Sequence, residues 1–391
     1  MLLLIFISAV GVGAAALLNL MSWPPYYEAL LGGVAIMAAG YVLSVAVEAA
    51  QKDVSRALAT IILALLAVLP EYAVDIYLAY MGGSHPHYVH YATANMTGAN
   101  RMLLGLFWPI VGFVGLYLGR GRKTVRGKAI ILDRSFRLEV FFLLLATLYS
   151  FKLPLFGRIT IFDSLVLVSI FGAYAWIASS SHLREEEFEG VVESIVHLRK
   201  PLRITIVSFL FLMAGAVIFL SVERFTEGLI RTGELFGISE FLLIQWVAPV
   251  ASEMPELVVA VLLALKGKTT TAIGALVSSK VNQWTLLVGA LPLAYSLGSG
   301  RLTSMPLDPL QREELFLTAA QSLFGSILIA DLKLSRGDAL LLFTLFWLQW
   351  LIPIPSVRMV VGVIYIVLSV VLIFKDRGRM ISLLRYARDL L

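Results

Sequence analysis

The sequence lacks cysteine and has few charged residues. None of its 391 residues is cysteine, which excludes disulfides, thiolate metal sites and cysteine nucleophiles. Only 15% are Asp, Glu, Lys or Arg, whereas an ordinary soluble domain has about 25%. Hydrophobic residues make up 59% of the chain. This balance excludes a soluble enzyme and leaves no room for a separate globular domain, so we expect a polytopic membrane protein.

The sequence also lacks residue pairs that indicate catalysis. No apolar run carries a His-Glu or Ser-His pair at catalytic spacing, so we expect no enzymatic activity and no cofactor. The net charge of +5 does not indicate a nucleic-acid surface, because cationic residues of membrane proteins gather in cytoplasmic loops for topological reasons. The expected partners are the lipid bilayer and inorganic cations.

Apolar runs bounded by charge, Gly or Pro predict twelve membrane-spanning helices. Their approximate ranges are 1–20, 28–50, 57–80, 92–119, 138–154, 159–180, 204–222, 239–265, 270–298, 313–331, 338–355 and 358–374. The first run has no Lys or Arg at its start and is followed by an aromatic cluster at 23–27. We therefore interpret it as an uncleaved helix and not as a signal peptide.

The cationic residues predict the orientation of these helices. If both termini lie inside, the inside segments hold 22 Lys and Arg residues and the outside segments hold 7. This asymmetry is what the positive-inside rule requires, and it predicts a multi-pass protein of the cell (inner) membrane with both termini cytoplasmic. The two remaining cations, Arg101 and Lys280, fall inside predicted spans.

Two stretches of the sequence resemble each other. Pro70-Glu71 in the third predicted span corresponds to Pro255-Glu256 in the eighth. Each pair is followed by a short loop and a helix start rich in small residues, at 92–100 and at 272–280. The repeat unit therefore comprises five spans. Because five is odd, the second copy crosses the membrane in the opposite sense, which is the inverted-repeat architecture of many secondary transporters.

At these residues the chain resembles the calcium/cation antiporter superfamily of sodium/calcium exchanger-like membrane proteins. Each of that family's two repeats has a G-T-S-x-P-E helix followed by a G-N-x-x-G-S-N-x-x-N/D helix. The second half matches best, since 251–256 reads A-S-E-M-P-E and 274–283 reads G-A-L-V-S-S-K-V-N-Q. Residues 331–338 are similar to the family's loop between the fourth and fifth helices of a repeat. The resemblance covers about residues 28–355.

The resemblance implies an all-α polytopic membrane protein with two inverted five-helix repeats and one extra helix at each end. The expected divisions are an N-terminal helix (1–27), a first repeat (28–180), a cytoplasmic linker (181–203), a second repeat (204–355), and a C-terminal helix with a basic tail (356–391). The linker is short and acidic, and we expect a solvated helix there. We expect the basic tail to lie on anionic headgroups.

Glu71 and Glu256 are the principal candidates for a cation site. A carboxylate inside the bilayer costs several kcal/mol unless it is neutralised, paired or directed at a polar cavity. A proline inside a span removes a backbone hydrogen bond and frees carbonyl oxygens. Carbonyl and carboxylate oxygens are hard ligands that suit Na⁺ or Ca²⁺. A packing kink explains one such proline equally well, but two equivalent Pro-Glu pairs favour a site.

Amide and hydroxyl side chains complete the candidate ligand set. The chain has only four Asn, and three of them lie in the two small-residue helices. The resemblance places Gln283 on a family ligand position. Helix packing is the alternative role of these small-residue helices. The predicted cation ligands are Glu71, Asn95, Asn100, Glu256, Ser279, Asn282 and Gln283.

The sequence departs from the family at several ligand positions. In the first repeat Leu66-Ala67-Val68 replaces the G-T-S triplet, and Ala99 and Leu103 replace the serine and asparagine of the second helix. The hydroxyl ligands of that half are therefore gone. In the second repeat Ser252 is kept within the triplet and Glu253 adds a carboxylate.

Lys280 stands where the family has an asparagine, and two interpretations remain open. In the first, Lys280 forms a structural ion pair with Glu253. In the second, Lys280 takes the place of a bound sodium ion and releases its carboxylate when a cation or proton arrives. Arg101 also has two possible roles. It forms a second ion pair with Asp75, or its side chain snorkels toward the membrane surface. We expect Glu253, Lys280, Asp75, Arg101 and Ser252 to tune the site.

These features predict a secondary active antiporter that exchanges Ca²⁺ or a related cation against Na⁺ or H⁺ by alternating access. The alternative is a degenerate member of the family that keeps the fold but acts as a non-transporting membrane scaffold or sensor. A weaker signal is His85-x-His87-x-x-His90 in an outside loop. Three imidazoles at that spacing can bind zinc or sense pH, but no carboxylate or cysteine accompanies them, so exposed loop histidines are expected.

Overall fold

The computed structural model describes residues 1–53, 68–119, 125, 126, 129–180, 190–352, 354–376, 378 and 386. It is nearly all helical. The chain divides into two compact units, and each combines segments from both halves of the sequence. Unit 1 consists of Met1–Asn95 and Ala175–Glu256, and unit 2 consists of Met96–Tyr174 and Leu257–Leu391. Neither unit coincides with one of the two repeats expected from the sequence. The repeats therefore stay a prediction.

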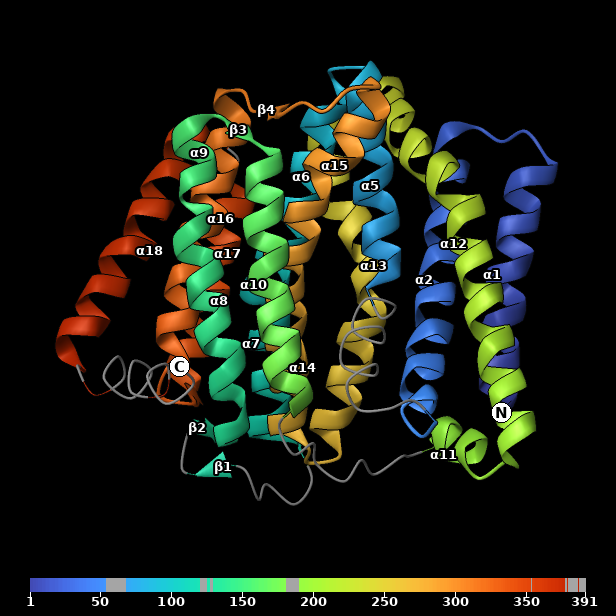
Figure 1. Ribbon diagram of the computed structural model, residues 1–391, viewed down its shortest axis with the longest axis horizontal. Helices are drawn as coiled ribbons and strands as arrows, with labels where there is room; N and C mark the ends of the chain where they lie inside the picture. The colour runs from blue at the N-terminus through green and yellow to red at the C-terminus, as the bar shows by residue number, and fades with distance from the viewer. Residues whose placement is uncertain are drawn as a thin grey trace. The chain divides into compact units, whose positions relative to one another are not determined.

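Unit 1 is built around two long helices that lie side by side (Figure 1). These are α2 (Pro25–Ala50) and α12 (Lys200–Phe236), and α1 (Leu2–Leu20) packs against both. α5 (Leu69–Ser84) packs against the same pair. The remaining helical segments of unit 1 are the start of α6 (Tyr88–Met102), the end of α10 (Ile161–Ser180), α11 (Gly190–Val196) and most of α13 (Glu240–Leu265).

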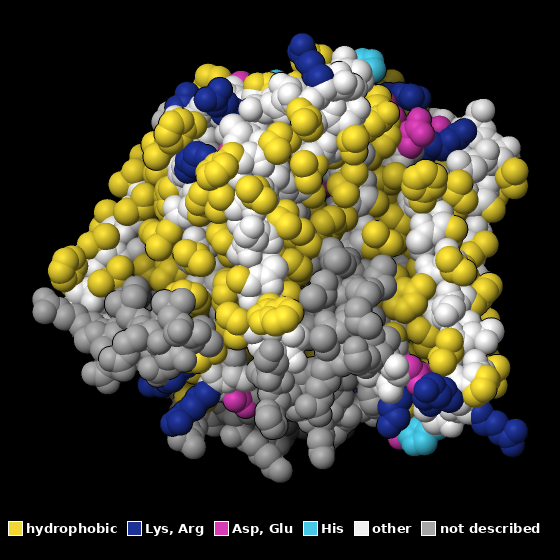
Figure 2. Space-filling view, viewed as in Figure 1, with side chains coloured by type: hydrophobic (Ala, Val, Ile, Leu, Met, Phe, Trp, Pro, Cys, Tyr) yellow, Lys and Arg dark blue, Asp and Glu magenta, His cyan; other side chains and the backbone are white. Residues whose placement is uncertain are grey.

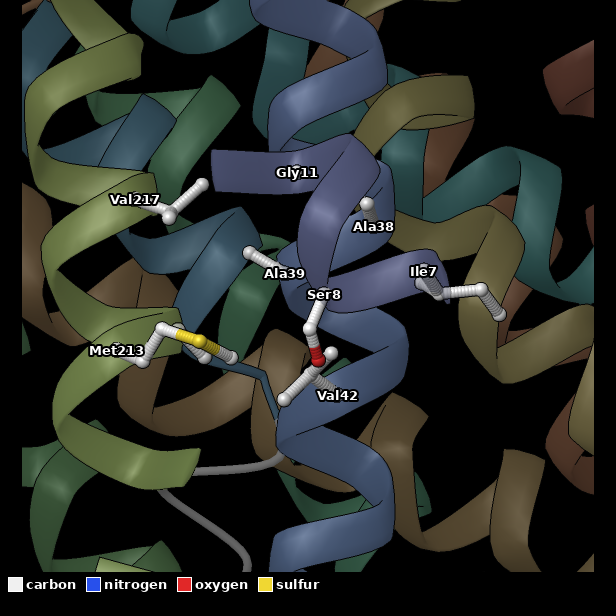
Figure 3. Close-up of a pocket in the computed structure, with 9 residues that line it drawn as sticks. Ile7, Ser8, Gly11, Ala38, Ala39, Val42, Met213 and Val217 are labelled. Atoms are coloured by element: carbon white, nitrogen blue, oxygen red, sulfur yellow. The ribbon is translucent and has the colours of Figure 1, made fainter. Parts of the chain in front are cut away.

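The face of α2 that contacts its neighbours contains many small residues. A Cβ atom on Gly32 would lie 2.7 Å from the Cβ of Phe225, so α12 approaches the α2 backbone closely. A Cβ on Gly11 of α1 would lie 3.1 Å from the Cβ of Ala38. A pocket of about 10 Å³, no larger than one water molecule requires, lies where α1, α2 and α12 meet (Figure 3). Its labelled lining is apolar apart from Ser8, so it does not suit a cation.

Unit 2 is a bundle in which α16 and α14 contact several neighbours. α16 (Pro309–Leu328) packs against α18 (Pro355–Lys375) and α8 (Arg137–Ser150), while α14 (Thr269–Asn282) packs against α8 and α7 (Trp108–Phe113). The other elements of unit 2 are η2 (Leu103–Phe107), η3 (Val114–Leu118), η4 (Arg134–Phe136), α9 (Lys152–Phe156), η5 (Gln283–Leu287), α15 (Val288–Ser299) and α17 (Arg336–Leu351).

Five short strands join loops of unit 2, a detail that the all-helical expectation missed. At one end β1 (Val125–Arg126) pairs with β2 (Ala129–Ile131), and β2 pairs with β5 (Lys333–Ser335). At the other end β3 (Arg158–Ile159) pairs with β4 (Met305–Pro306) (Figure 1). All three pairings are antiparallel. β2 and β5, like β3 and β4, come from opposite halves of the sequence, so both ends of unit 2 hold the two halves together.

Eight helices among the described residues are long and apolar enough to cross a membrane. Each of the twelve predicted spans overlaps at least one helix, although residues 57–67 of the third span lie outside the described residues. The helices at the third, ninth, tenth and eleventh spans are not among the eight. The number twelve therefore stays a prediction.

The helix surfaces carry the side chains that a lipid bilayer requires. On the visible faces of both units, hydrophobic side chains cover the helices and Lys and Arg side chains gather at the helix ends (Figure 2). On α18, for example, Val363, Val367 and Phe374 are exposed by about half of their surface or more. Surfaces of this kind suit hydrocarbon and not water, in agreement with a membrane protein.

An ion pair joins the end of α2 to the start of α12 within unit 1. Arg203 donates from Nε to Oδ2 of Asp53 and from Nη2 to Oδ1, both at 2.6 Å. This two-pronged contact lowers the pKa of Asp53 below its ordinary value of 3.8, because the guanidinium stabilises the carboxylate. The two longest helices of the unit are therefore tied at one end by a charged contact.

We expect Asp53→Asn to lower the unfolding temperature of the purified protein at neutral pH. Because the pKa of Asp53 is depressed in the folded state, its contribution is present above the unfolded pKa and is lost as the pH falls through the folded pKa. The difference between the variant and the native protein should shrink between about pH 7 and about pH 3 in thermal melts. A difference that stays constant over that range would contradict this role.

The described part of the predicted linker packs against other helices of unit 1. Residues 181–189 lie outside the described residues, and α11 follows them. Val192, Ile195 and Val196 of α11 are buried in the cluster formed with α2 and α12. The solvated helix expected for the acidic segment lies mostly outside the described residues, and α11, which overlaps its end, exposes Glu193 on its other face. Most of the basic tail also lies outside the described residues.

Candidate cation-binding site

The first Pro-Glu pair lies at the beginning of α5. Pro70 occupies the first turn, where its missing N–H leaves no helical hydrogen bond unmade. Glu71 follows it and is only 2% exposed. A carboxylate in the first turn is stabilised by the positive end of the helix dipole. In the described residues α5 begins at Leu69, and the part of the predicted span that precedes Val68 lies outside the described residues, so the interruption of the span at Pro70 stays a prediction.

The second Pro-Glu pair lies in the interior of α13, as the sequence predicts. Pro249 and Pro255 both fall inside this continuous helix, and each removes one backbone donor. Glu253 is buried to 2% exposure, while Glu256 is half-buried. The hydroxyl of Ser252 donates to the carbonyl oxygen of Ala248 at 3.3 Å, so Ser252 is part of the helix backbone network of α13.

One residue of α2 brings the two Pro-Glu pairs together. A Cβ atom on Gly40 would lie 3.0 Å from Cγ of Pro255 and 3.3 Å from Cγ of Pro70. The two proline rings, one from each half of the sequence, therefore contact the same point of the α2 backbone. Glu71 and Glu256 each directly follow one of these prolines in the chain, so the two motif glutamates begin from the same level of α2 within unit 1.

Asp75 and Asn95 form a second polar contact in unit 1. Both side chains are completely buried, and Nδ2 of Asn95 donates to Oδ1 of Asp75 at 3.0 Å. Asp75 lies one turn after Glu71 on α5, and Asn95 lies on α6. The pair expected between Asp75 and Arg101 is wrong, because Asp75 accepts from Asn95 while Arg101 has a different carboxylate partner, described below.

Lys280 in unit 2 is hydrogen-bonded to both the backbone and the side chain of Asn100. Its Nζ donates to Oδ1 of Asn100 at 2.7 Å and to the carbonyl oxygen of Asn100 at 2.9 Å. The same ammonium lies 4.9 Å from the ring centre of Trp284. Lys280 and Asn100 are completely buried, and they stand at corresponding positions of the two similar stretches of the sequence. A fixed cation therefore occupies the side-chain oxygen of Asn100, a predicted cation ligand, together with its backbone carbonyl oxygen. The expected pairing of Lys280 with Glu253 stays a prediction.

A π-helix begins at the same position of each of the two similar stretches of the sequence. η2 begins at Leu103 and η5 begins at Gln283, directly after α6 and α14. Turns of this kind are rare and occur often at functional sites, because they shift backbone carbonyl groups out of the regular helical pattern. The sequence carries no signal for them beyond the repeat itself. Ser279 is half-buried, and Asn282 and Gln283 are buried, around the start of η5.

Arg101 belongs to a buried charge cluster that the sequence analysis missed. Its guanidinium pairs with Glu314 of α16, and Glu314 also pairs with Arg358 of α18. All three side chains are at most 4% exposed. Arg101 therefore does not snorkel. The predicted topology counts Arg358 among the seven cations of the outside segments.

The predicted site residues fall into two sets. Those of unit 1 are Glu71, Asp75, Asn95, Ser252, Glu253 and Glu256, and those of unit 2 are Asn100, Arg101, Ser279, Lys280, Asn282 and Gln283. No three His, Asp or Glu side chains in the described part of the chain are arranged to hold a metal ion by themselves. A dication needs about six to eight oxygens, so amide, hydroxyl and carbonyl oxygens have to complete any site.

The three histidines do not form a zinc site in the described structure. His85 and His87 are exposed, and their ring centres lie 6.2 Å apart. The ring of His87 lies 4.6 Å from that of Tyr88, so these imidazoles pack on aromatic rings. The interpretation as surface histidines agrees with this geometry.

Comparisons with known proteins agree with the resemblance seen in the motifs. A family model described as sodium/calcium exchanger protein matches residues 26–179 and 206–354. The crystal structure of the H⁺/Ca²⁺ exchanger CAX is 44% identical, with a TM-score of 0.94, and the match covers 100% of this chain and 98% of that chain.

Two more distant structures share the fold. YfkE is 15% identical with a TM-score of 0.65, over 93% of this chain and 99% of that chain. The sodium-calcium exchanger NCX_Mj is 16% identical with a TM-score of 0.54, over 85% and 99%. The putative antiporter CaxA of Alkalimonas amylolytica is 24% identical over 152 residues, which are 37% of this chain and 46% of that protein. The chain thus matches about half the length of this curated relative.

Proposed function

The chain belongs to the sodium/calcium exchanger protein family, and from this premise we propose that it is a secondary active antiporter for Ca²⁺ or a related cation against Na⁺ or H⁺. The observation that carries the proposal is the meeting of Pro70 and Pro255 at Gly40. It supports a shared site, because a glutamate directly follows each of the two prolines that meet at this level of α2. The H⁺/Ca²⁺ exchange of the relative that is 44% identical favours Ca²⁺ as cargo and H⁺ as counter-ion.

Glu71 and Glu256 are the principal cation ligands or proton acceptors in this proposal. Both fall within membrane spans that the sequence predicts, where an ionised carboxylate needs a cation or a proton as compensation. Asn95, Asn100, Ser279, Asn282 and Gln283 supply further oxygens. Exchange requires only that the two ions compete for the same carboxylates, because each ion then leaves when the other binds.

The proposed architecture is two inverted five-helix repeats with one added helix at each end, twelve helices in total. The strand pairings support it. In the proposed repeats β2 of the first corresponds to β4 of the second, and β3 of the first corresponds to β5 of the second. The pairing of β2 with β5 at one end of unit 2 therefore has its counterpart in the pairing of β4 with β3 at the other end. The π-helices at Leu103 and Gln283 support it as well. The charge asymmetry of the loops favours the cell (inner) membrane with both termini in the cytoplasm.

In this architecture alternating access comes from α2 and α12 moving along the motif helices. The close approach of glycine to proline at Gly40 favours such movement, because Gly40 has no side chain to interlock with the rings of Pro70 and Pro255. The ion pair between Asp53 and Arg203 supports joint movement of α2 and α12.

Lys280 gives the proposed site a built-in cation. Its ammonium bonds two oxygens of Asn100, the same atoms that a sodium ion would bind. We expect Lys280→Asn to free these oxygens and to raise the share of Ca²⁺ uptake that a Na⁺ gradient drives at least about threefold. Lys152→Asn, which removes an ion-paired lysine elsewhere in unit 2, is the control. An unchanged ion preference in Lys280→Asn would contradict this role.

The proposal is tested by flux in liposomes that contain the purified protein. We expect an imposed H⁺ or Na⁺ gradient to drive Ca²⁺ uptake above that of protein-free liposomes, and collapse of the gradient with an ionophore to stop it. The alternative, a scaffold or sensor with the same fold, predicts uptake equal to the protein-free control under every gradient. That outcome would overturn the antiporter proposal.

A further inference from the structure

A groove of unit 1 is lined by residues of α1, α5 and α12. Its volume is about 420 Å³, within the range of about 300 to 1,000 Å³ that is usual for small-molecule sites. Asn19 at the end of α1 closes one side, because its Nδ2 donates to the carbonyl oxygen of Leu220 at 3.1 Å. None of the predicted cation ligands is among the described residues that line this groove.

The apolar part of the groove is open to the surroundings of the protein. Phe219 and Leu220 line it, and they are 79% and 55% exposed. Both fall within the predicted span 204–222. Exposed hydrophobic side chains on a membrane-spanning segment contact acyl chains, so this part of the groove suits lipid.

The charged part of the groove lies directly beyond that span. Glu223 and Arg224 line it and belong to the predicted outside segment. Glu223 follows Phe219 by one helical turn, a rise of about 6 Å along α12. Arg224 donates from Nη1 to the carbonyl oxygen of Met21 at 3.3 Å, close to the aromatic cluster that begins at Trp23. Aromatic clusters of this kind mark the membrane–water interface, so the charged part lies at the level of the lipid headgroups.

Arg224 supplies donors that suit a phosphate group. In the described part of the chain its hydrogen bonds all leave from Nη1, to the carbonyl oxygens of Leu18 and Met21 and to Oε1 of Glu28. Glu28 also contacts Nη1 of Arg231 at 4.0 Å, so one carboxylate serves two guanidinium groups. The Nε and Nη2 groups of Arg224 form the fork with which arginine binds two phosphate oxygens.

Glu223 and Tyr77 supply acceptors that suit an ammonium group. Glu223 is exposed and interacts electrostatically with Tyr77 of α5. The hydroxyl of Tyr77 donates to Oε1 of Glu227 at 3.2 Å, and its oxygen therefore keeps the capacity to accept. A primary ammonium carries several N–H donors and can bond both groups, whereas a quaternary ammonium has no N–H to donate.

The charges around the groove disfavour a lipid with a net negative charge. Three glutamates and two arginines sum to one negative charge, and these are Glu28, Glu223, Arg224, Glu227 and Arg231. Glu234 and Glu240, which act together with Glu227 on Tyr91, add to the negative charge at this end of the unit. A headgroup that carries both signs matches these surroundings better than an anionic one.

We propose that this groove binds a phospholipid with a zwitterionic, primary-amine headgroup, whose phosphate contacts Arg224 and whose ammonium contacts Glu223 and Tyr77. The acyl chains then lie on Phe219 and Leu220. In the predicted orientation this is a lipid of the outer leaflet. The inference goes beyond the proposed antiport, and its test requires no transport.

The test measures which phospholipids the purified protein retains. The protein in detergent is mixed with equal amounts of phosphatidylethanolamine, phosphatidylcholine and phosphatidylglycerol that share the same acyl chains, and bound lipid is counted by native mass spectrometry. We expect phosphatidylethanolamine to be retained at least about threefold more than either other lipid, because only its headgroup makes both contacts.

Two variants separate the contacts with the headgroup. Glu223→Gln should lower the retention of phosphatidylethanolamine at least about threefold and leave that of phosphatidylcholine unchanged. Arg224→Lys should lower the retention of both lipids, because both carry the phosphate. Glu234→Gln is the matched control, since it removes one exposed negative charge from the same helix outside the groove.

Equal retention of the three lipids by the native protein would overturn the proposal. Equal retention of phosphatidylethanolamine by Glu223→Gln and Glu234→Gln would overturn it as well. With Ca²⁺ added, loss of a bound Ca²⁺ ion and not of lipid in Glu223→Gln would show that the groove binds a cation, and would contradict the lipid site. If Arg224→Lys does not fold, the comparison of Glu223→Gln with Glu234→Gln decides alone. Absence of gradient-driven uptake overturns the antiporter proposal and leaves this result untouched.

Discussion

Glu71→Gln and Glu256→Gln are each expected to reduce gradient-driven Ca²⁺ uptake at least about a hundredfold, which corresponds to about 2.7 kcal/mol. The substitution keeps the size of the side chain but removes the charge that binds the cation and the proton. Removing one partner of a buried charged contact costs about 2 to 5 kcal/mol, so the expected loss lies within the usual range. Initial uptake rates in liposomes, normalised to the amount of inserted protein, provide the measurement.

The control for this pair of variants is Glu28→Gln in the same unit. Glu28 is also buried, at 8% exposure, but it lies in the first turn of α2 and its Oε1 contacts Nη1 of Arg224 at 3.4 Å. We expect its uptake rate to stay within about twofold of native, because partly exposed ion pairs contribute about 0 to 1 kcal/mol. Near-native exchange by Glu71→Gln or Glu256→Gln would contradict the role of that residue as a cation ligand.

Gly40→Val is expected to stop exchange without removing any polar group. Already the Cβ atom would lie 3.0 Å from Pro255 and 3.3 Å from Pro70, and the two rigid rings leave no space for the further methyl groups. Overpacking of this kind costs about 1 to 3 kcal/mol of stability. We expect the maximal rate of uptake to fall at least about tenfold, because α2 can no longer move along the two prolines.

Gly215→Val provides the matched control for the glycine. No atom lies within 4 Å of the position of a Cβ on Gly215, which belongs to α12 in the same unit. Its unfolding temperature and its uptake rate should therefore stay close to the native values. Equal loss in both glycine variants would show that valine in these helices is itself harmful, and native rates in Gly40→Val would contradict the moving contact at Gly40.

Local sequence patterns singled out part of the candidate site. The Pro-Glu pairs, the clustered asparagines and the intramembrane lysine stand out because apolar spans rarely contain such residues, and the structure buries Glu71, Asn95, Asn100 and Lys280. The partners of these residues were not predictable, since they depend on packing between distant segments. Asn100 lies 180 residues from Lys280 in the chain, and Asn95 rather than Arg101 contacts Asp75.

Other features had no local signal at all. Glu314 and Arg358 stand near the edges of apolar runs, where charged residues are usual, and only the packing of α16 against α18 buries them. The short strands have two or three residues each and form because loops from opposite halves meet. The π-helices depend on backbone geometry that no residue pattern marks. The grouping of segments into two units likewise follows from long-range contacts.

The most direct test of the central claim is equilibrium binding of Ca²⁺ to the purified protein while the Na⁺ concentration or the pH is varied. If Glu71 and Glu256 form one site shared by both ions, Na⁺ or H⁺ should raise the apparent Kd for Ca²⁺ without changing the number of sites. Glu71→Gln and Glu256→Gln should each abolish this binding. Ca²⁺ binding that neither ion displaces, or that survives in both variants, would contradict a shared carboxylate site.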